Sequence, residues 1–180
     1  AFVAADLLSQ AEHGPDSQVF LVTTAASLVV KVQAELSRQM KSLPRKALAE
    51  QSLANSRAVV MQDMDEAMEL VNAYAPEHLI ICCRDAEALA EKVVNAGSVF
   101  IGNFSPESVG DYASGTNHTL PTNGFARAYS GVSVDSFVKK ITFQQLTQEG
   151  LTRIGKAVVV MAEAEGLSAH ARAVSLRTQI

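Results

Sequence analysis

The 180-residue sequence contains no tryptophan, only two cysteines and no excess of basic residues. Its 15 lysines and arginines stand against 19 aspartates and glutamates, and no basic cluster forms a stripe along a helix or loop, so no nucleic-acid partner is expected. The apolar stretch from Val19 to Val30 is broken by threonines, alanines and a serine, whereas a bilayer span needs roughly 18 to 20 apolar residues. The sequence therefore predicts neither a nucleic-acid-binding protein nor a membrane-spanning one.

The two cysteines, Cys82 and Cys83, are adjacent at the end of an apolar run. Successive side chains of a strand point to opposite faces, so the pair excludes a disulfide framework. A redox-active pair or a soft-metal site is an alternative, but without a second cysteine pair a buried strand end is favoured. The first residues include Asp6 and lack the basic region of a secretory signal, so we expect a cytoplasmic location. The start within a helical pattern, without an initiating methionine, suggests a piece of a longer chain.

Apolar runs rich in β-branched residues alternate with segments of helical spacing through residues 1–133. The spacing predicts strands at 18–24, 58–62, 79–83 and 98–102. It predicts helices at 2–13, 25–43, 45–54, 63–73 and 85–96. Strands separated by helices of about ten to twenty residues indicate a parallel sheet covered on both faces. We therefore predict an α/β fold in which residues 1–133 form an incomplete, partial Rossmann-like domain, a parallel sheet flanked by helices, that carries most of the site residues.

The amino-acid composition changes after this region of alternating strands and helices. Residues 103–130 are rich in Gly, Ser, Pro, Asn and Thr, with a short helix expected at 106–112. Such a long polar stretch in a compact domain is usually functional or disordered, and its many potential ligands favour function. Helices are predicted at 147–163 and 168–176. Residues 134–180 are therefore expected to form a helical tail that packs elsewhere.

Polar side chains near element ends are the candidates for chemistry. Gln10 and His13 are three residues apart at a helix end, so they project from one face and could share a ligand, although a solvated helix end is the plainer alternative. Asp111 follows a glycine in a turn, where aspartate most often caps backbone amides. Glu77 and His78 directly precede a buried strand; an adjacent acid and imidazole could divide proton-transfer work, or form a plain surface pair.

Two further histidines lie in other contexts. His118 occurs in a polar loop of the kind that approaches a small polar ligand. His170 and Glu165 flank the break between the two tail helices and, taken alone, look like a helix-end pair. A histidine side chain titrates near pH ~6.5 and commonly ligates metals, so convergence of the histidines would indicate an active site.

The joint pattern of these segments resembles the histidinol dehydrogenase family. The segments that carry the resemblance are Ala-Pro-Glu-His-Leu at 75–79, Ser-Pro-Glu-Ser-Val-Gly-Asp-Tyr-Ala-Ser-Gly at 105–115, Asn-His-Thr-Leu-Pro-Thr at 117–122 with Gly124 and Ala126-Arg127, and Ala-Glu-Ala-Glu-Gly-Leu-Ser-Ala-His at 162–170. The resemblance extends over essentially the whole chain, from the helix of Gln10 and His13 onward, and corresponds to the C-terminal portion of that enzyme.

The resemblance implies a function and a set of roles. Members of this family use zinc and NAD to oxidise L-histidinol through an aldehyde to L-histidine, in histidine biosynthesis. The family's zinc ligands fall on Gln10, His13, Asp111 and His170. Its general base falls on His78, and the residue that activates water falls on Glu77. The implied substrate contacts are Gln10, His13, His78, Asp111, His118, Glu165 and His170.

The family also implies a homodimer whose tail, with Glu165 and His170, completes the partner's site. Its NAD-contacting region and a substrate-binding serine belong to sequence upstream of Ala1, and no Gly-x-Gly-x-x-Gly fingerprint occurs, so no cofactor-binding residue is expected in this chain. We therefore predict weak or no turnover by the chain alone. The alternatives are a non-catalytic zinc-binding and dimerisation fragment, and a zinc hydrolase that uses Glu77 to activate water.

Overall fold

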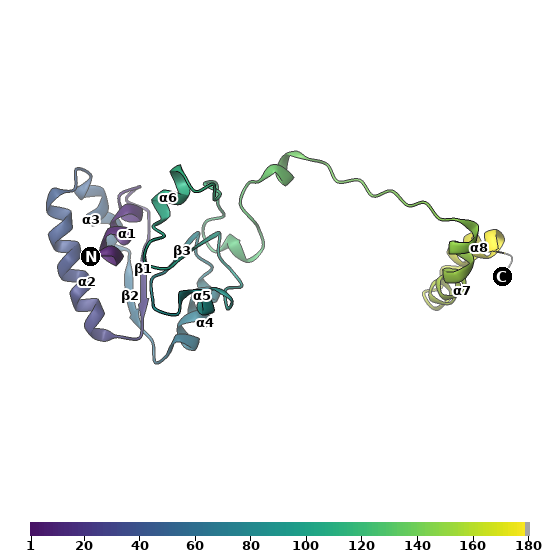
Figure 1. The fold of residues 1–180 in the computed structure, drawn as a ribbon, viewed down its shortest axis with the longest axis horizontal. Coiled ribbons are helices and arrows are strands. Elements are labelled where there is room, and N and C mark those ends of the chain that lie inside the picture. The colour runs from purple at the N-terminus through teal and green to yellow at the C-terminus, as the bar shows by residue number, and fades with distance from the viewer. Residues whose placement is uncertain (179–180) are drawn as a thin grey trace. The chain divides into compact units, whose positions relative to one another are not determined.

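The computed structural model describes residues 1–178. These fall into two compact units, one of residues 1–137 and one that begins at Val138. The chain and its elements are drawn in Figure 1. The first unit contains the four strands, and the second contains two long helices.

Parallel strand pairs form the framework of the first unit. Strand β1 (Phe20–Thr23) pairs with β2 (Arg57–Val60), and β3 (His78–Ile81) pairs with β4 (Ser98–Ile101). Each pair is joined through helices, as parallel pairing requires. The predicted α/β fold with parallel strands is confirmed. The strands form two separate two-stranded sheets, however, and not the single sheet that their alternation with helices suggested.

Three helices pack together beside the first strand pair. They are α1 (Phe2–Ala11), α2 (Ala26–Gln39) and α3 (Lys46–Ala54), with a 3-10 turn, η1 (Met40–Ser42), between the last two. Leu8, Ala11 and Ala49 are buried where α1 meets α3, and Leu36 and Leu53 pack against them. Alanines at these contacts let the helix backbones approach closely. This packing fixes the C-terminal end of α1, where Gln10 lies.

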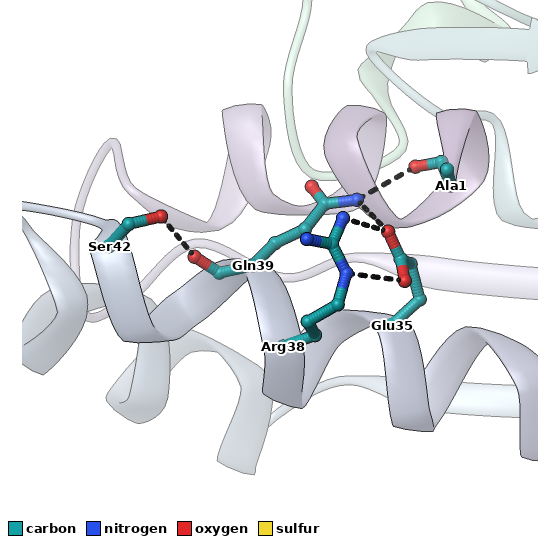
Figure 2. Close-up of polar contacts among 5 residues, drawn as sticks. All are labelled: Ala1, Glu35, Arg38, Gln39 and Ser42. Atoms are coloured by element: carbon teal, nitrogen blue, oxygen red, sulfur yellow. Dashed lines mark hydrogen bonds and ion pairs between the residues drawn. The ribbon is translucent and has the colours of Figure 1, made fainter.

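Polar contacts attach the other end of α1 to α2 (Figure 2). Gln39 donates from Nε2 to the carbonyl oxygen of Ala1 at 3.0 Å and to Glu35 Oε1 at 2.8 Å. Arg38 donates from Nε and Nη2 to the two oxygens of Glu35 at 2.9 and 2.6 Å. The hydrogen bonds from Arg38 and then Gln39 lower the pKa of Glu35 to about 2. Glu35 therefore stays ionised at neutral pH and holds the start of α1 against α2 through Gln39.

The second strand pair is covered by α4 (Met64–Tyr74) and the short α5 (Ala86–Ala90). Met68, Ile81, Ala86 and Leu89 form the buried core between them. Helix α4 begins where Asp63 accepts a hydrogen bond from the backbone N–H of Glu66 at 2.8 Å, as a helix cap does. It ends at Tyr74, and its C-terminal cap, Ala75, has a φ of 56°, which is unusual for a residue other than glycine.

The helix predicted at 85–96 ends at Ala90 because a side chain of α4 binds the backbone that follows. Asn72 Oδ1 accepts from the backbone N–H groups of Val94 at 2.7 Å and Asn95 at 3.2 Å. Asn72 Nδ2 donates to the carbonyl oxygen of Lys92 at 3.0 Å. In a continued helix these backbone groups would bond within the next turn. The contact with Asn72, which is distant in sequence, therefore ends the helix earlier than the local spacing of apolar residues predicts.

The polar stretch after β4 is mostly irregular. It contains α6 (Glu107–Tyr112) and two 3-10 turns, η2 (Phe125–Arg127) and η3 (Val134–Phe137). The short helix predicted at 106–112 is confirmed.

The second unit contains a helical hairpin of α7 (Gln148–Ala164) and α8 (Ser168–Thr178). Both helices were predicted from the sequence, and they pack along each other with Ala162 and Ala171 buried. Gly166 allows the turn between them, with a φ of 73°. None of the helices within residues 1–178 is long and apolar enough to cross a membrane.

Candidate functional site

Polar side chains from three separate elements meet beside the start of β3. They are Gln10 from the end of α1, His78 from β3, and Glu107 and Asp111 from α6. Glu107 lies at the centre, with 3% of its side chain exposed. Its Oε2 accepts a hydrogen bond from Gln10 Nε2 at 2.6 Å, and its Oε1 lies 3.7 Å from His78 Nε2. We call these four residues the Glu107 cluster.

Strand pairing fixes the position of His78 and its neighbour. The backbone N–H of Gly97 donates to the carbonyl oxygen of Pro76 at 2.9 Å, and that of Ser98 donates to Glu77 at 2.9 Å. His78 then pairs with Ser98 in the β3–β4 register. The Glu77–His78 pair therefore lies at the amino end of a parallel strand, whereas ligand crevices of such sheets usually open at the carboxyl ends.

Helix α6 carries both carboxylates of the cluster. Glu107 and Asp111 are four residues apart, so they lie on the same face of the helix. The helix follows Pro106, which has an extended backbone with φ −68° and ψ 147°. Gly110 lets α6 approach β4, because a Cβ at this position would lie 2.6 Å from the ring of Phe100. The backbone of α6 is thus held tightly against the strand pair that carries His78.

Glu107 was not among the site residues predicted from the sequence. The available signal was its spacing of four residues from Asp111 on a predicted helix, which places two carboxylates on one face. Its burial and its contact with Gln10, 97 residues away in the chain, depend on tertiary structure. Spacing alone therefore could not distinguish it from a solvated helix residue.

His118 pairs with Asp111 at the outer side of the cluster. The Nδ1 of His118 lies 2.9 Å from Asp111 Oδ1, and 71% of the His118 side chain is exposed. The hydrogen bond between them lowers the pKa of Asp111 and raises the pKa of His118. Burial, and then the hydrogen bond with Asp111, raise the pKa of Glu107 to about 7. Of the two carboxyl groups, Asp111 is therefore the one that ionises first.

The Glu77 and His78 side chains are shifted toward their neutral forms. Burial is the main cause in both cases: it raises the pKa of Glu77 and lowers the pKa of His78. The charges of His13 and Asp111 also act on both groups, so His13 contributes to the electrostatic field of the same region. A histidine kept neutral in a partly buried position is able to accept a proton.

The donor set fits a divalent cation. His78, Glu107 and Asp111 each offer a ligand atom, and these atoms lie within 4.8 Å of one another. Within residues 1–178, His78 Nε2 and Glu107 Oε1 are buried atoms without a hydrogen-bond partner. Buried polar groups normally have a partner, so these atoms indicate a ligand or an ordered water between them. Imidazole and carboxylate are suitable ligands for zinc, and Gln10 presents its amide nitrogen to Glu107 at this point.

The remaining predicted site residues lie at other positions. His13 follows α1 and is exposed, beyond Gln10 on the same chain segment. Glu165 and His170 belong to the second unit, where both are exposed. Glu165 is the C-terminal cap of α7, and His170 lies in the first turn of α8, with its N–H bonded to the carbonyl oxygen of Leu167 at 3.0 Å. The first unit thus brings together Gln10, Glu77, His78, Asp111 and His118, with His13 acting on them electrostatically.

Known proteins resemble this chain along almost all of its length. The family described as "Histidinol dehydrogenase" matches residues 1–178. A histidinol dehydrogenase of Bacteroides fragilis is 61% identical over 178 residues, which cover 99% of this chain and 42% of the relative. A chloroplastic histidinol dehydrogenase of Arabidopsis thaliana is 59% identical over 98% of this chain and 38% of its own length.

A solved structure agrees with the sequence relatives. The crystal structure of histidinol dehydrogenase from Elizabethkingia anophelis superimposes with a TM-score of 0.91 and 56% identity, over 99% of this chain and 41% of that one. The chain therefore spans about two-fifths of the length of the relatives that it matches.

Proposed function

This chain belongs to the histidinol dehydrogenase family. From that membership we propose that it carries the zinc-binding and proton-transfer part of an active site. The reaction of that site is the NAD-linked, four-electron oxidation of L-histidinol to L-histidine, through histidinal, in histidine biosynthesis. The observation that carries this proposal is the Glu107 cluster. It places Gln10 and Asp111, two of the proposed zinc ligands, beside His78, the proposed base, whose buried Nε2 has no hydrogen-bond partner within residues 1–178.

The proposed zinc ligands are Gln10, His13 and Asp111, with His170 from the exchanged tail of a partner subunit in a homodimer. Asp111 is the anionic member of this set, and its contact with His118 stabilises the ionised form. When bound, zinc would act as a Lewis acid that holds the imidazole and amino nitrogens of L-histidinol. His118 and Glu165 are the proposed additional substrate contacts, since a carboxylate suits an ammonium group.

Glu77 and His78 are the proposed proton-transfer residues. Burial lowers the pKa of His78, so the imidazole is neutral at physiological pH and able to accept the hydroxyl proton of the substrate. Burial raises the pKa of Glu77, which makes this carboxylate a better base for activating water on the aldehyde. The charges of His13, Asp111 and His118 act on both groups, which supports their acting on the same carbon at different stages.

Zinc-dependent binding of L-histidinol tests the proposal. Isothermal titration of L-histidinol into the zinc-loaded chain should give saturable heat, and titration into the metal-free chain should give none. The physical reason is that the substrate nitrogens need the cation as their partner. The His13→Ala and His170→Ala variants should each weaken this binding. Absence of zinc binding in the unaltered chain would instead support a non-catalytic fragment that folds and dimerises.

The chain alone should show weak or no turnover. It spans about two-fifths of the length of its relatives, and no Gly-x-Gly-x-x-Gly fingerprint for a dinucleotide occurs in it. The measurement is NADH absorbance at saturating L-histidinol, NAD and zinc. Robust NADH formation by the purified 180-residue chain would show that the NAD-binding function resides here after all.

A further inference from the structure

Glu107 is a carboxyl group in an unfavourable place for folding. Only 3% of its side chain is exposed, and burying a carboxyl group without complete hydrogen bonding destabilises a protein. Only its Oε2 accepts a hydrogen bond from Gln10; its Oε1 is buried and without a hydrogen-bond partner within the described chain. A buried carboxyl group with an unpaired oxygen beside the proposed ligands is a candidate for a role in the site.

The contact with Gln10 determines which amide atom can bind a cation. A glutamine side chain has an oxygen that can ligate a metal and an NH2 group that cannot. Gln10 donates from Nε2 to Glu107 Oε2 at 2.6 Å. The ionised carboxylate of Glu107 can only accept, and this bond therefore orients the amide with its nitrogen toward Glu107. Its Oε1 is then left free on the other side.

We propose that Glu107 is a positioning residue that fixes the amide of Gln10 so that Oε1 serves as a zinc ligand. This proposal rests on the proposed zinc site. The same helix carries Asp111 one turn later, so α6 supplies one ligand directly and orients a second through Glu107. The cluster thereby couples the ends of α1 and α6, which are distant in sequence.

The test uses metal affinity and a spectrum, with the full chain. Glu107→Met keeps the side-chain volume but removes the acceptor, and it should weaken zinc binding by about 10- to 100-fold, as loss of an outer partner of a ligand typically does. Glu107→Gln retains one carbonyl oxygen that can accept from Gln10, so it should lose much less affinity. Cobalt(II) bound to Glu107→Met should show altered d–d absorption bands, whereas Glu91→Met, on an exposed residue, should match the unaltered chain.

A double-mutant cycle separates positioning from a general loss of structure. If Glu107 acts through the amide, the Glu107→Met change should cost little further zinc affinity once Gln10→Ala has removed that amide. Equal losses in both backgrounds, or no loss in Glu107→Met, would overturn the positioning role while leaving the zinc site in place. An unaltered chain that binds neither zinc nor cobalt would overturn the zinc site itself. Thermal unfolding of each variant shows that affinities are compared between folded proteins.

Discussion

Replacing Asp111 with alanine should weaken zinc binding by more than about 100-fold, because loss of a ligand exceeds the 10- to 100-fold loss expected for an outer partner. Asp111 is the anionic member of the proposed ligand set, and 9% of its side chain is exposed. The hydrogen bond with His118 lowers its pKa and keeps it ionised. Competition with a chromophoric zinc chelator at neutral pH measures the change.

The matched control is Asp16→Ala. Asp16 is an exposed aspartate in the turn after α1, so its loss removes the same charge without removing a proposed ligand. Its zinc affinity should stay within about twofold of the unaltered chain, because exposed charges are screened by salt. If Asp111→Ala retained the affinity of this control, Asp111 would not be a ligand.

Replacing Gly97 with alanine should destabilise the first unit by about 3 kcal/mol, at the upper end of the cost of overpacking. A Cβ at this position would lie 2.5 Å from the carbonyl oxygen of Glu77 and 3.3 Å from Leu120 Cβ. The nearest atom belongs to the backbone just before β3, so it cannot rotate away as a side chain can. Urea unfolding followed by far-ultraviolet circular dichroism measures the loss.

Gly14→Ala is the control for this substitution. Its Cβ would lie 2.9 Å from Asp16 Oδ1, which is the end of a flexible side chain. The variant should change the free energy of unfolding by less than about 0.5 kcal/mol, as surface substitutions usually do. Equal destabilisation by the two changes would show that the backbone contact of Gly97 is not the cause. Because Gly97 is hydrogen-bonded to Pro76, its variant should also weaken binding of L-histidinol to the zinc-loaded chain, through displacement of His78.

The fold was largely predictable because the relevant patterns are local. Helical spacing and short β-branched runs report which side of each element is buried, and that information lies within a few residues. The helix expected at 85–96 was too long because Asn72 binds backbone groups 20 to 23 residues away. The alternation of strands and helices predicted parallel pairing, but it does not show whether one strand pair is hydrogen-bonded to the other. The division into two sheets therefore required the structure.

The site was less predictable from the sequence than the fold was. Glu77, His78 and Asp111 were identified as candidates from neighbouring residues, but their roles came from the resemblance to a family. Glu107 was missed because nothing in its neighbours indicates that it is buried against Gln10. Glu165 and His170 remain predictions, since their proposed function requires a second chain. Local chemistry thus identifies candidates, while burial and long-range contact decide which of them act together.

The left-handed backbone of Ala75 restricts the path of the chain between α4 and β3. Its φ of 56° costs a residue with a Cβ roughly 1–2 kcal/mol. Part of this is offset, because alanine leaves the unfolded chain with less entropy than glycine would, an effect of about 0.4–1 kcal/mol. The turn therefore keeps a net cost in stability, because the strain exceeds this offset, and it permits fewer exit angles from α4 than a glycine would. The methyl group of Ala75 thus limits the directions in which the chain can enter β3, and with them the directions in which Glu77 and His78 can face.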